Sequence, residues 1–416
     1  MNHREDVLII GGGVIGVCAA YYLVERGARV TLVEQGEIAA GCSYGNAGLV
    51  VPSHCVPLAN PDALTSGLRW MLNPESPFYI KPRLDRDLMV WLLRFSLAAR
   101  PGPMRRAIPM LRELGRLSRS LYAELAALDG LNFGFTLTGA LHIFKTQAGY
   151  RSAAEEVHLL REHGLAAELL DAAQVRAKEP AVQPAIVGGV CYPHDAHLDP
   201  AAFVRGLARL SEKKGVRLQT STEVLGFEIS GRSVTSVKTT RGDFHPGQVV
   251  LAAGSWSPGV ARDLRLNLPI QPAKGYSVTV KRPPTCPAVP LLLGEARVAV
   301  TPLGETLRFA GTLELAGLDL SINRRRVAAV MRAAREYLTG MAELETVEIW
   351  RGLRPCTPDG LPLLGRPSAF ENLIVAAGHA MIGMSLGPVT GKLVSQLACG
   401  ESPAIDLKPM RAERFR

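Results

Sequence analysis

The chain has 416 residues and a mass of 44.7 kDa, which is more than one hydrophobic core usually organises, so we expect two domains. A composition of 47% hydrophobic and 20% charged residues excludes disordered, coiled-coil and collagen-like chains. The net charge is +9, the seven cysteines show no CxxC or metal-ligand spacing, and neither a signal peptide nor a membrane-spanning run is present; we therefore expect a cytoplasmic protein without a metal site.

The first forty residues predict a strand–helix–strand unit. Residues 7–10 favour a buried parallel strand, residues 14–25 a helix, and residues 29–33 a second strand that ends at Glu34. A glycine-rich turn in this context is the fingerprint of a dinucleotide site. We therefore predict a bound dinucleotide rather than a glycine-rich turn that holds no ligand.

Gly11, Gly13 and Gly16 have the G-x-G-x-x-G spacing of that fingerprint. The first glycine permits the tight turn, the second lets the backbone approach a pyrophosphate, and the third lets the helix pack closely on the strand. The helix N-terminus supplies N–H groups to phosphate oxygens. Glu34 is placed to accept hydrogen bonds from ribose hydroxyls and would repel the 2′-phosphate of NADP, so NAD and FAD remain open at this point.

The loop at residues 39–49 consists mostly of small residues and is followed by Val-Pro-Ser-His, which ends at His54. Next comes a basic segment, residues 81–119, with ten basic and three acidic residues. It predicts two helices, 84–99 and 104–128, separated by a break at Pro101-Gly102-Pro103. Two interpretations stay open for it: a helix pair whose apolar stripe packs on the protein, or a peripheral contact with an anionic membrane.

Four later segments have strand character with turn residues between them: 140–144, 275–280, 296–300 and 307–312. They predict a second, mostly antiparallel sheet. Tyr276 in the second segment is a candidate for a hydroxyl in the substrate pocket. His54 is a second candidate for a polar contact in that pocket. In each case the alternative is a buried structural residue.

Four segments complete the pattern: the small-residue loop 39–49, a strand and turn at 249–256, Arg-Gly-Leu-Arg-Pro-Cys-Thr-Pro-Asp-Gly at 351–360, and a strand ending in Gly378-His379 that leads into a helix at 389–397. In this order they resemble the D-amino-acid oxidase superfamily of flavoproteins over residues 7–397. The Ser-Tyr-Gly-Asn-Ala-Gly loop most resembles the bacterial D-amino-acid and hydroxyproline dehydrogenase group, with glycine oxidase nearby.

The resemblance implies non-covalent FAD and a set of residues along it. The pyrophosphate would lie at Val14 and Ile15, the adenosine ribose at Glu34 and Gln35, and the adenine at Val224, taken as the end of a strand from Arg217. The remaining expected FAD contacts share small or apolar character: Cys42, Ser43, Asn46, Ala47, Gly48, Leu49, Ala253, Gly254, Trp256, Gly378, His379, Gly383, Met384 and Ser385.

The resemblance also places the substrate carboxylate at Arg354, because a guanidinium makes two parallel charge-assisted bonds to a carboxylate. The alternative is a structural ion pair with Asp359, and Arg351 is the weaker candidate. Met381 stands where glycine oxidase has an arginine, which favours a larger or apolar substrate side chain. Cys356 is expected to carry no flavin bond, and His379 is expected to be structural, because hydride transfer to flavin needs no strong base.

The fold expected is therefore α/β, with a Rossmann-like FAD-binding domain (1–50, 195–265 and 348–416) and an α+β substrate domain (51–194 and 266–347). The activity expected is oxidative deamination of D-amino acids, or of D-proline or hydroxyproline-type imino acids, with electrons passed to a quinone, a dye or a partner flavoprotein. The alternatives are an oxidase that forms peroxide and a tRNA-modifying flavoprotein; we expect no nucleic-acid partner because no base-reading motif is present.

Overall fold

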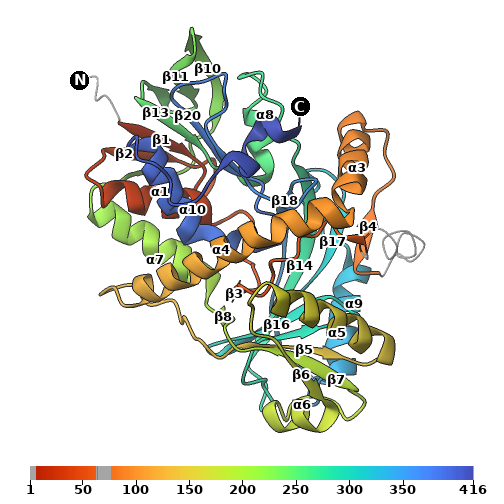
Figure 1. The fold of residues 1–416 in the computed structure, drawn as a ribbon. Coiled ribbons are helices and arrows are strands. Elements are labelled where there is room, and N and C mark those ends of the chain that lie inside the picture. Colours follow the sequence, from red (N-terminus) through yellow and green to blue (C-terminus); the bar gives the residue numbers. More distant parts are fainter. Residues whose placement is uncertain (1–5, 62, 64–75, 416) are drawn as a thin grey trace.

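The computed structural model describes residues 6–61, 63 and 76–415, and two large sheets organise it (Figure 1). The first sheet has six strands in the order β19-β20-β13-β1-β2-β9 and is parallel except at the edge pair β19–β20. Its strands are β1 (Val7–Ile10), β2 (Val30–Val33), β9 (Arg217–Gln219), β13 (Gln248–Leu251), β19 (Leu363–Gly365) and β20 (Leu373–Ala377). Most of these strands are covered on both faces, which is why they are short continuous apolar runs.

Helices cover one face of this sheet, and a small sheet covers the other. Ile9 packs on the side of α1 (Val14–Val24), α7 (Pro200–Lys213) and α10 (Gly383–Ala398). Leu8 and Ile10 face a three-stranded antiparallel sheet instead, because successive strand side chains alternate between faces. That sheet consists of β10 (Val224–Ser230), β11 (Ser233–Thr239) and β12 (Gly242–Phe244).

The second large sheet has nine strands, most of them paired antiparallel, in the order β18-β14-β17-β16-β15-β5-β7-β6, with β4 paired to β17. The strands are β4 (Phe78–Ile80), β5 (Ala140–Phe144), β6 (Glu168–Asp171), β7 (Gly188–Tyr192), β14 (Gln271–Lys281), β15 (Leu291–Leu293), β16 (Val298–Leu303), β17 (Thr306–Leu315) and β18 (Thr346–Cys356). The predicted α/β fold with a second, mostly antiparallel sheet is confirmed.

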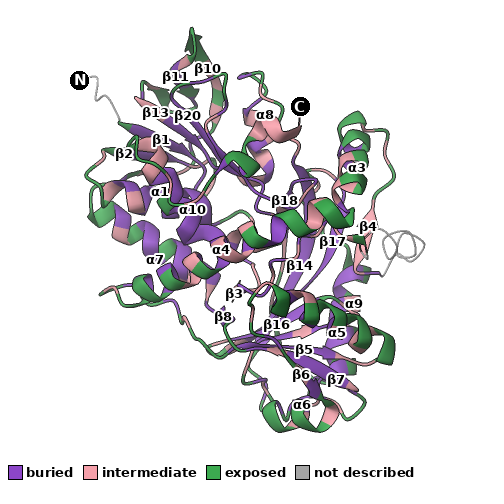
Figure 2. Ribbon diagram, in the orientation of Figure 1, coloured by how far each residue is buried: buried purple, intermediate pink, exposed green. Residues whose placement is uncertain are grey.

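Helices also pack against this sheet, and they bury its central strands (Figure 2). Helix α9 (Arg324–Tyr337) covers one face, and α5 (Gln147–Glu162) and α6 (Ala172–Lys178) lie by β5, β6 and β7. Helix α3 (Arg86–Ala98) projects at one side of the molecule, and α4 (Pro101–Ala126) runs between the two large sheets (Figure 1). The short elements are β3 (Leu49–Val50), β8 (Ala196–His197), α8 (Ser257–Val260), η1 (Gly254–Trp256), η2 (Ala380–Ile382), η3 (Lys408–Met410) and η4 (Ala412–Phe415).

Two parts of the predicted domain division differ from the sheets. The boundary at residue 348 falls inside β18, which belongs to the nine-stranded sheet. Helix α4, assigned to the substrate domain, places Leu114, Leu121 and Tyr122 in the core around the six-stranded sheet. The sequence predicted that this helix pair packs on the protein, but not that α4 would meet the six-stranded sheet.

Two predicted helix boundaries are wrong, and proline explains both. Pro101 and Pro103 do not break the chain but form the first turn of α4, where a missing N–H costs nothing. Helix α10 begins at Gly383, six residues before the predicted Val389, with Pro388 inside it. Pro388 has no N–H to donate to the Met384 carbonyl four residues earlier. That carbonyl instead accepts a hydrogen bond from the Tyr122 hydroxyl.

Two strand boundaries also differ. Val224 does not end the strand from Arg217, because β9 stops at Gln219 and Val224 starts β10. The strand predicted from residue 296 begins at Val298, because Arg297 has a left-handed backbone with φ of 51°.

Candidate active site

The glycine-rich turn after β1 has the geometry that its spacing predicts. Gly11 has φ of 117°, and a Cβ added to it would lie 2.5 Å from the Ala252 carbonyl oxygen. A Cβ on Gly16 would lie 1.9 Å from the Gly11 carbonyl oxygen, so this glycine allows α1 to pack against the turn. Gly13 differs, since the atom nearest to an added Cβ is Ser43 Oγ at 3.4 Å. An added Cβ would make one ordinary van der Waals contact with this oxygen, and Gly13 itself lines the cavity, so a methyl group fits the protein but takes space from a ligand.

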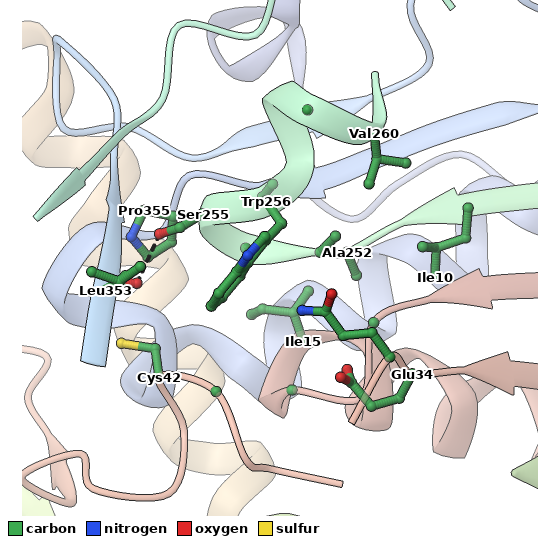
Figure 3. A pocket seen from close by; sticks show the side chains of 18 of the residues that line it. Ile10, Ile15, Glu34, Cys42, Ala252, Ser255, Trp256, Val260, Leu353 and Pro355 are labelled. Atoms are coloured by element: carbon green, nitrogen blue, oxygen red, sulfur yellow. Dashed lines mark hydrogen bonds between the residues drawn. The ribbon is translucent and has the colours of Figure 1, made fainter. Parts of the chain in front are cut away.

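A cavity of about 520 Å³ extends from this turn. Figure 3 shows Glu34 and Cys42 on opposite sides of it, with Trp256 between them. It contains most of the residues expected at FAD: Gly11, Gly13, Val14, Ile15, Glu34, Gln35, Cys42, Ser43, Asn46, Val224, Ala253, Gly254, Trp256, Gly378, His379, Gly383 and Met384. Its lining joins segments from both ends of the chain.

Five expected contacts lie outside the described lining. Gly16 serves the packing of α1, and Ser385 Oγ accepts from Val51 N–H at 3.1 Å and donates to the Leu49 carbonyl at 2.9 Å. The Leu49 carbonyl is thus held by Ser385, and an added Cβ on Gly48 would lie 2.2 Å from the Leu198 carbonyl oxygen. Ala47 stands in the chain between Gly48 and the lining residue Asn46.

Glu34 is tied to the turn by both of its carboxylate oxygens. Oε2 accepts from Gly12 N–H at 2.7 Å, and Oε1 accepts from Gly36 N–H at 2.9 Å. Ser43 Oγ accepts from Val14 N–H at 3.0 Å, at the first residue of α1. The loop at 39–49 thus caps the helix whose N-terminus faces the cavity, and hydroxyl, carboxylate and backbone groups there suit the ribose and phosphate groups of a dinucleotide.

Several lining residues were missed at the sequence level. Leu225 and Phe227 belong to β10, and its hairpin with β11 shows alternating apolar residues around Gly231, a signal that was present in the sequence. Leu353 and Pro355 flank Arg354 in β18, and Ser255 Oγ donates to the Leu353 carbonyl at 2.8 Å. Other lining residues, such as Asp263 and Leu320, carried no recognisable signal.

Arg354 is half-buried beside the cavity, between the lining residues Leu353 and Pro355. Its Nη1 donates to the Thr312 carbonyl at 2.7 Å, and its positive charge lowers the pKa of Cys42, which burial raises. Asp359, the alternative partner, is engaged by Arg414 at 2.7 and 3.0 Å. Within the part of the chain that the structure describes, no carboxylate pairs with Arg354.

The second arginine of this segment has a different environment. Arg351 Nε donates to the Leu320 carbonyl at 3.0 Å, so it fastens a loop near the sheet edge. Trp350 lies over Gly45 of the loop and over Gly352, whose added Cβ atoms would fall 2.1 and 2.0 Å from its ring. One face of β18 therefore carries Trp350 against the loop, and alternation places Arg354 further along the same face.

The other substrate candidates lie in three different environments. The Tyr276 hydroxyl donates to Glu314 Oε2 at 2.9 Å, on the side of the sheet covered by α9. His54 Nε2 lies 3.3 Å from His142 Nε2, and burial first, then the Arg297 charge, lowers the pKa of His54 to about 4. Met381 lies in η2 and is 46% exposed. Element η2, which carries Met381, packs against β18, the strand that carries Arg354.

His379 and Cys356 are buried next to the cavity end. His379 Nε2 is 3.0 Å from Thr390 Oγ1, and burial lowers the pKa of His379 to about 3. Burial also raises the pKa of the Cys356 thiol to about 12. At neutral pH both are uncharged, so Arg354 supplies the positive charge at this end.

Asp195, next to the cavity loop, gives a test of the buried electrostatics. It is fully buried, accepts from Ser53 N–H at 3.2 Å and from the Ser53 hydroxyl, and burial raises its pKa to about 7. Because the pKa of this carboxyl is higher in the folded state than its unfolded value of about 4, the free energy of unfolding of the protein falls as the pH rises from about 4 to about 7. The expected loss is up to about 4 kcal/mol, and it persists above pH 7.

Asp195→Asn removes the ionisation; its Oδ1 can still accept from Ser53 N–H, and its Nδ2 can donate to Ser53 Oγ, which reverses the second hydrogen bond. We expect this variant to match the wild type in urea unfolding at pH 4 and to exceed its free energy of unfolding at pH 8. The titration of His54 and His142 is common to both proteins and cancels in the difference. Parallel pH profiles for the two proteins would contradict the assignment.

Comparisons with known proteins agree with this geometry. The family model described as DAO, FAD dependent oxidoreductase, matches residues 6–397. The chain is 33% identical to D-amino acid dehydrogenase of Granulibacter bethesdensis over 98% of this chain and 99% of that protein. It is 34% identical to D-amino acid dehydrogenase of Cereibacter sphaeroides over 98% and 95%, respectively.

Among solved structures, glycine oxidase from Geobacillus kaustophilus superposes with a TM-score of 0.81 at 25% identity, covering 99% of this chain and 98% of that one. L-proline dehydrogenase from P. horikoshii shares the fold, with a TM-score of 0.77 at 19% identity over 100% and 98% of the two chains. The predicted flavoprotein resemblance is confirmed, and the chain belongs to the DAO family of FAD-dependent oxidoreductases.

Proposed function

We propose that this protein is a dehydrogenase that oxidises the Cα–N bond of D-amino acids, yielding imino acids that water then hydrolyses to oxo acids. The observation that carries the proposal is the guanidinium of Arg354 beside the end of the dinucleotide cavity, without a carboxylate partner in the described chain. The D-stereochemistry rests on the relatives that are 33–34% identical over nearly their whole length.

When bound in the cavity, FAD supplies a two-electron acceptor for the hydride from Cα. The chain's own residues bind and orient the substrate. Arg354 holds the carboxylate by two parallel hydrogen bonds, which fixes where Cα lies. Gly383 starts α10 at the cavity, so the positive end of this 16-residue helix stabilises negative charge that develops there.

No charged base is required of the chain in this scheme. His379 is neutral and hydrogen-bonded to Thr390, and it keeps a fixed position in the turn before α10. A substrate amine that enters uncharged loses its Cα hydride and becomes an iminium, whose proton passes to water. Orientation and electrostatics are then the main contributions of the protein.

The function is tested by dye reduction with D-alanine, L-alanine, D-proline, the hydroxyprolines and D-alaninamide. We expect the D-amino acids to be oxidised, the L-form to be inert and the carboxamide to be poor. Slow oxygen consumption under the same conditions supports a dehydrogenase, whereas peroxide formation at the rate of dye reduction supports the alternative, an oxidase. Oxidation of L-alanine in preference to D-alanine would contradict the proposal.

We also propose that the electron acceptor is reached at a membrane surface through α3. None of the described helices combines the length and hydropathy that crossing a membrane requires. However, the apolar stripe of α3 is divided: Leu88 and Trp91 are buried, whereas a second face is exposed. That face consists of Met89, Val90, Leu93 and Leu97, which are 65%, 40%, 62% and 45% exposed.

Exposed arginines accompany this face: Arg86, Arg100, Arg105 and Arg106. A basic border around an apolar helix face suits an anionic lipid surface. We expect the holoprotein to sediment with vesicles of phosphatidylcholine and phosphatidylglycerol, and less so in high salt or without the anionic lipid. Leu93→Gln should reduce this binding, while Leu137→Gln, which changes a leucine 57% exposed elsewhere, should not. Equal binding by both variants would exclude α3 as the contact.

A further inference from the structure

A bulge in β17 lies directly beside the proposed carboxylate clamp. In the pairing of β14 with β17, Lys274 is opposite Glu314 and Tyr276 is opposite Gly311, so Thr312 and Leu313 together oppose Gly275. Thr312 has φ of 64°, the left-handed conformation in which such bulges usually place glycine. A β-branched residue in this conformation is an outlier, and outliers of this kind concentrate at functional sites.

The bulge and Gly275 together position the Arg354 guanidinium. A Cβ on Gly275 would lie 2.1 Å from Arg354 Nη1 and 2.6 Å from its Cζ, so the guanidinium occupies the space above this glycine. The Thr312 carbonyl accepts from Nη1 at 2.7 Å. One end of the guanidinium is therefore fixed to the bulge.

The Arg354 guanidinium, which the Thr312 carbonyl holds, lies on the face of the sheet that also carries Arg308. Arg308 lies four residues before Thr312 on β17. Its Nη1 donates to the carbonyl oxygens of Tyr44 and Asn46, in the loop at 39–49, at 3.3 and 2.9 Å. Regular alternation on β17 ends at Gly311, and the two bulge residues follow it opposite Gly275. The second bulge residue, Leu313, packs with Ala273 and Cys356, next to Arg354 in the neighbouring strands.

This hydroxyl is buried without a hydrogen-bond partner among the described residues, and the whole residue is 8% exposed. Buried hydroxyls are rarely left in this state, because the lost hydration is not replaced. A glycine at position 312 would relieve the backbone but would carry no hydroxyl. A threonine that combines this backbone conformation with an unpartnered hydroxyl therefore points to a use for its oxygen.

We propose that Thr312 completes the carboxylate site: its hydroxyl donates to the substrate carboxylate, while its carbonyl holds the Arg354 guanidinium that binds the same group. The inference rests on the proposed function for the identity of the ligand. It adds a second binding residue and assigns a role to the strained bulge.

The test uses FAD-loaded protein and propionate, the deaminated analogue of D-alanine, with binding followed by the change in flavin absorbance. Thr312→Val keeps the β-branched shape and removes the hydroxyl, and we expect it to weaken propionate about tenfold or more. Thr312→Ser should restore affinity to within about threefold. Thr312→Gly relaxes the backbone without restoring the hydroxyl, so it should remain weak even if the valine variant folds poorly.

Thr301→Val is the matched control. Thr301 of β16 also has a buried hydroxyl without a partner among the described residues, but it lies opposite Arg308 and not beside Arg354. The propionate affinity of the Thr301→Val variant should therefore equal that of the wild type. Equal affinities in wild type, Thr312→Val and Thr312→Gly would overturn the inference, as would a wild type that does not bind propionate. Failure of the proposed function is a separate result, seen when wild-type protein binds propionate but oxidises no D-amino acid.

Discussion

Replacing Arg354 by alanine is expected to lower kcat/KM for D-alanine by about 30- to 1000-fold, mostly through KM, which corresponds to roughly 2–4 kcal/mol of lost binding. The physical reason is that the guanidinium is half-buried beside the cavity and has no carboxylate partner in the described chain. Arg354→Lys keeps the charge but loses the planar fork, so its kcat/KM should lie between those of the wild type and the alanine variant.

Two comparisons separate the clamp from a general disturbance. D-alaninamide lacks the carboxylate, so Arg354→Ala should change its weak oxidation little. Arg351→Ala removes an arginine of the same strand that donates to the Leu320 carbonyl, and it should change kcat/KM by no more than about threefold. Arg354 does not bind the carboxylate if the two alanine variants lose the same fraction of kcat/KM for D-alanine. The same conclusion follows if Arg354→Ala lowers kcat/KM for the carboxamide as much as for D-alanine.

Gly13→Ala is expected to produce a folded protein that has lost FAD. The backbone at Gly13 has φ of −78°, which alanine adopts freely, and an added Cβ meets only Ser43 Oγ at 3.4 Å. The methyl group would therefore occupy space meant for the ligand. Losing two backbone hydrogen bonds to a phosphate should weaken FAD by at least about 100-fold, measured by the quenching of FAD fluorescence on binding to apoprotein.

Gly16→Ala is the contrasting variant. Its Cβ would lie 1.9 Å from the Gly11 carbonyl oxygen, so we expect α1 to lose its place on the turn and the apoprotein to unfold at a much lower temperature. Gly13→Ala apoprotein should melt close to the wild-type apoprotein. Normal FAD binding by Gly13→Ala would show that the dinucleotide does not lie against this glycine.

The sequence was sufficient for the parts of the fold that depend on local patterns. The turn at Gly11, Gly13 and Gly16 is specified by backbone sterics within one βαβ unit, so its spacing predicted both the packing at Gly16 and the position of Gly13 in the cavity wall. The antiparallel strands were visible for the same reason, because alternation is a property of each strand alone.

Features that depend on distant contacts could not be predicted in this way. Pro388 argues against a helix that starts at Gly383, because it leaves the Met384 carbonyl without its helical N–H. Only the structure shows that the Tyr122 hydroxyl from α4 donates to this carbonyl. Thr312 gave no signal, because its left-handed backbone arises from the pairing of two strands and not from its neighbours in sequence. Likewise, only the structure shows that Arg414 engages Asp359 and leaves Arg354 without that partner.

The most direct test of the account is anaerobic mixing of the purified yellow holoprotein with D-alanine, D-proline and their L-enantiomers while the flavin absorbance is followed. We predict rapid bleaching by at least one D-form, none by L-alanine, and slow recolouring when air is admitted but fast recolouring with a quinone or dye. A protein that takes up FAD but is bleached by no D-amino or D-imino acid would contradict the proposed substrate class. A protein that cannot take up FAD would contradict the central claim that the cavity beside Arg354 is a flavin site.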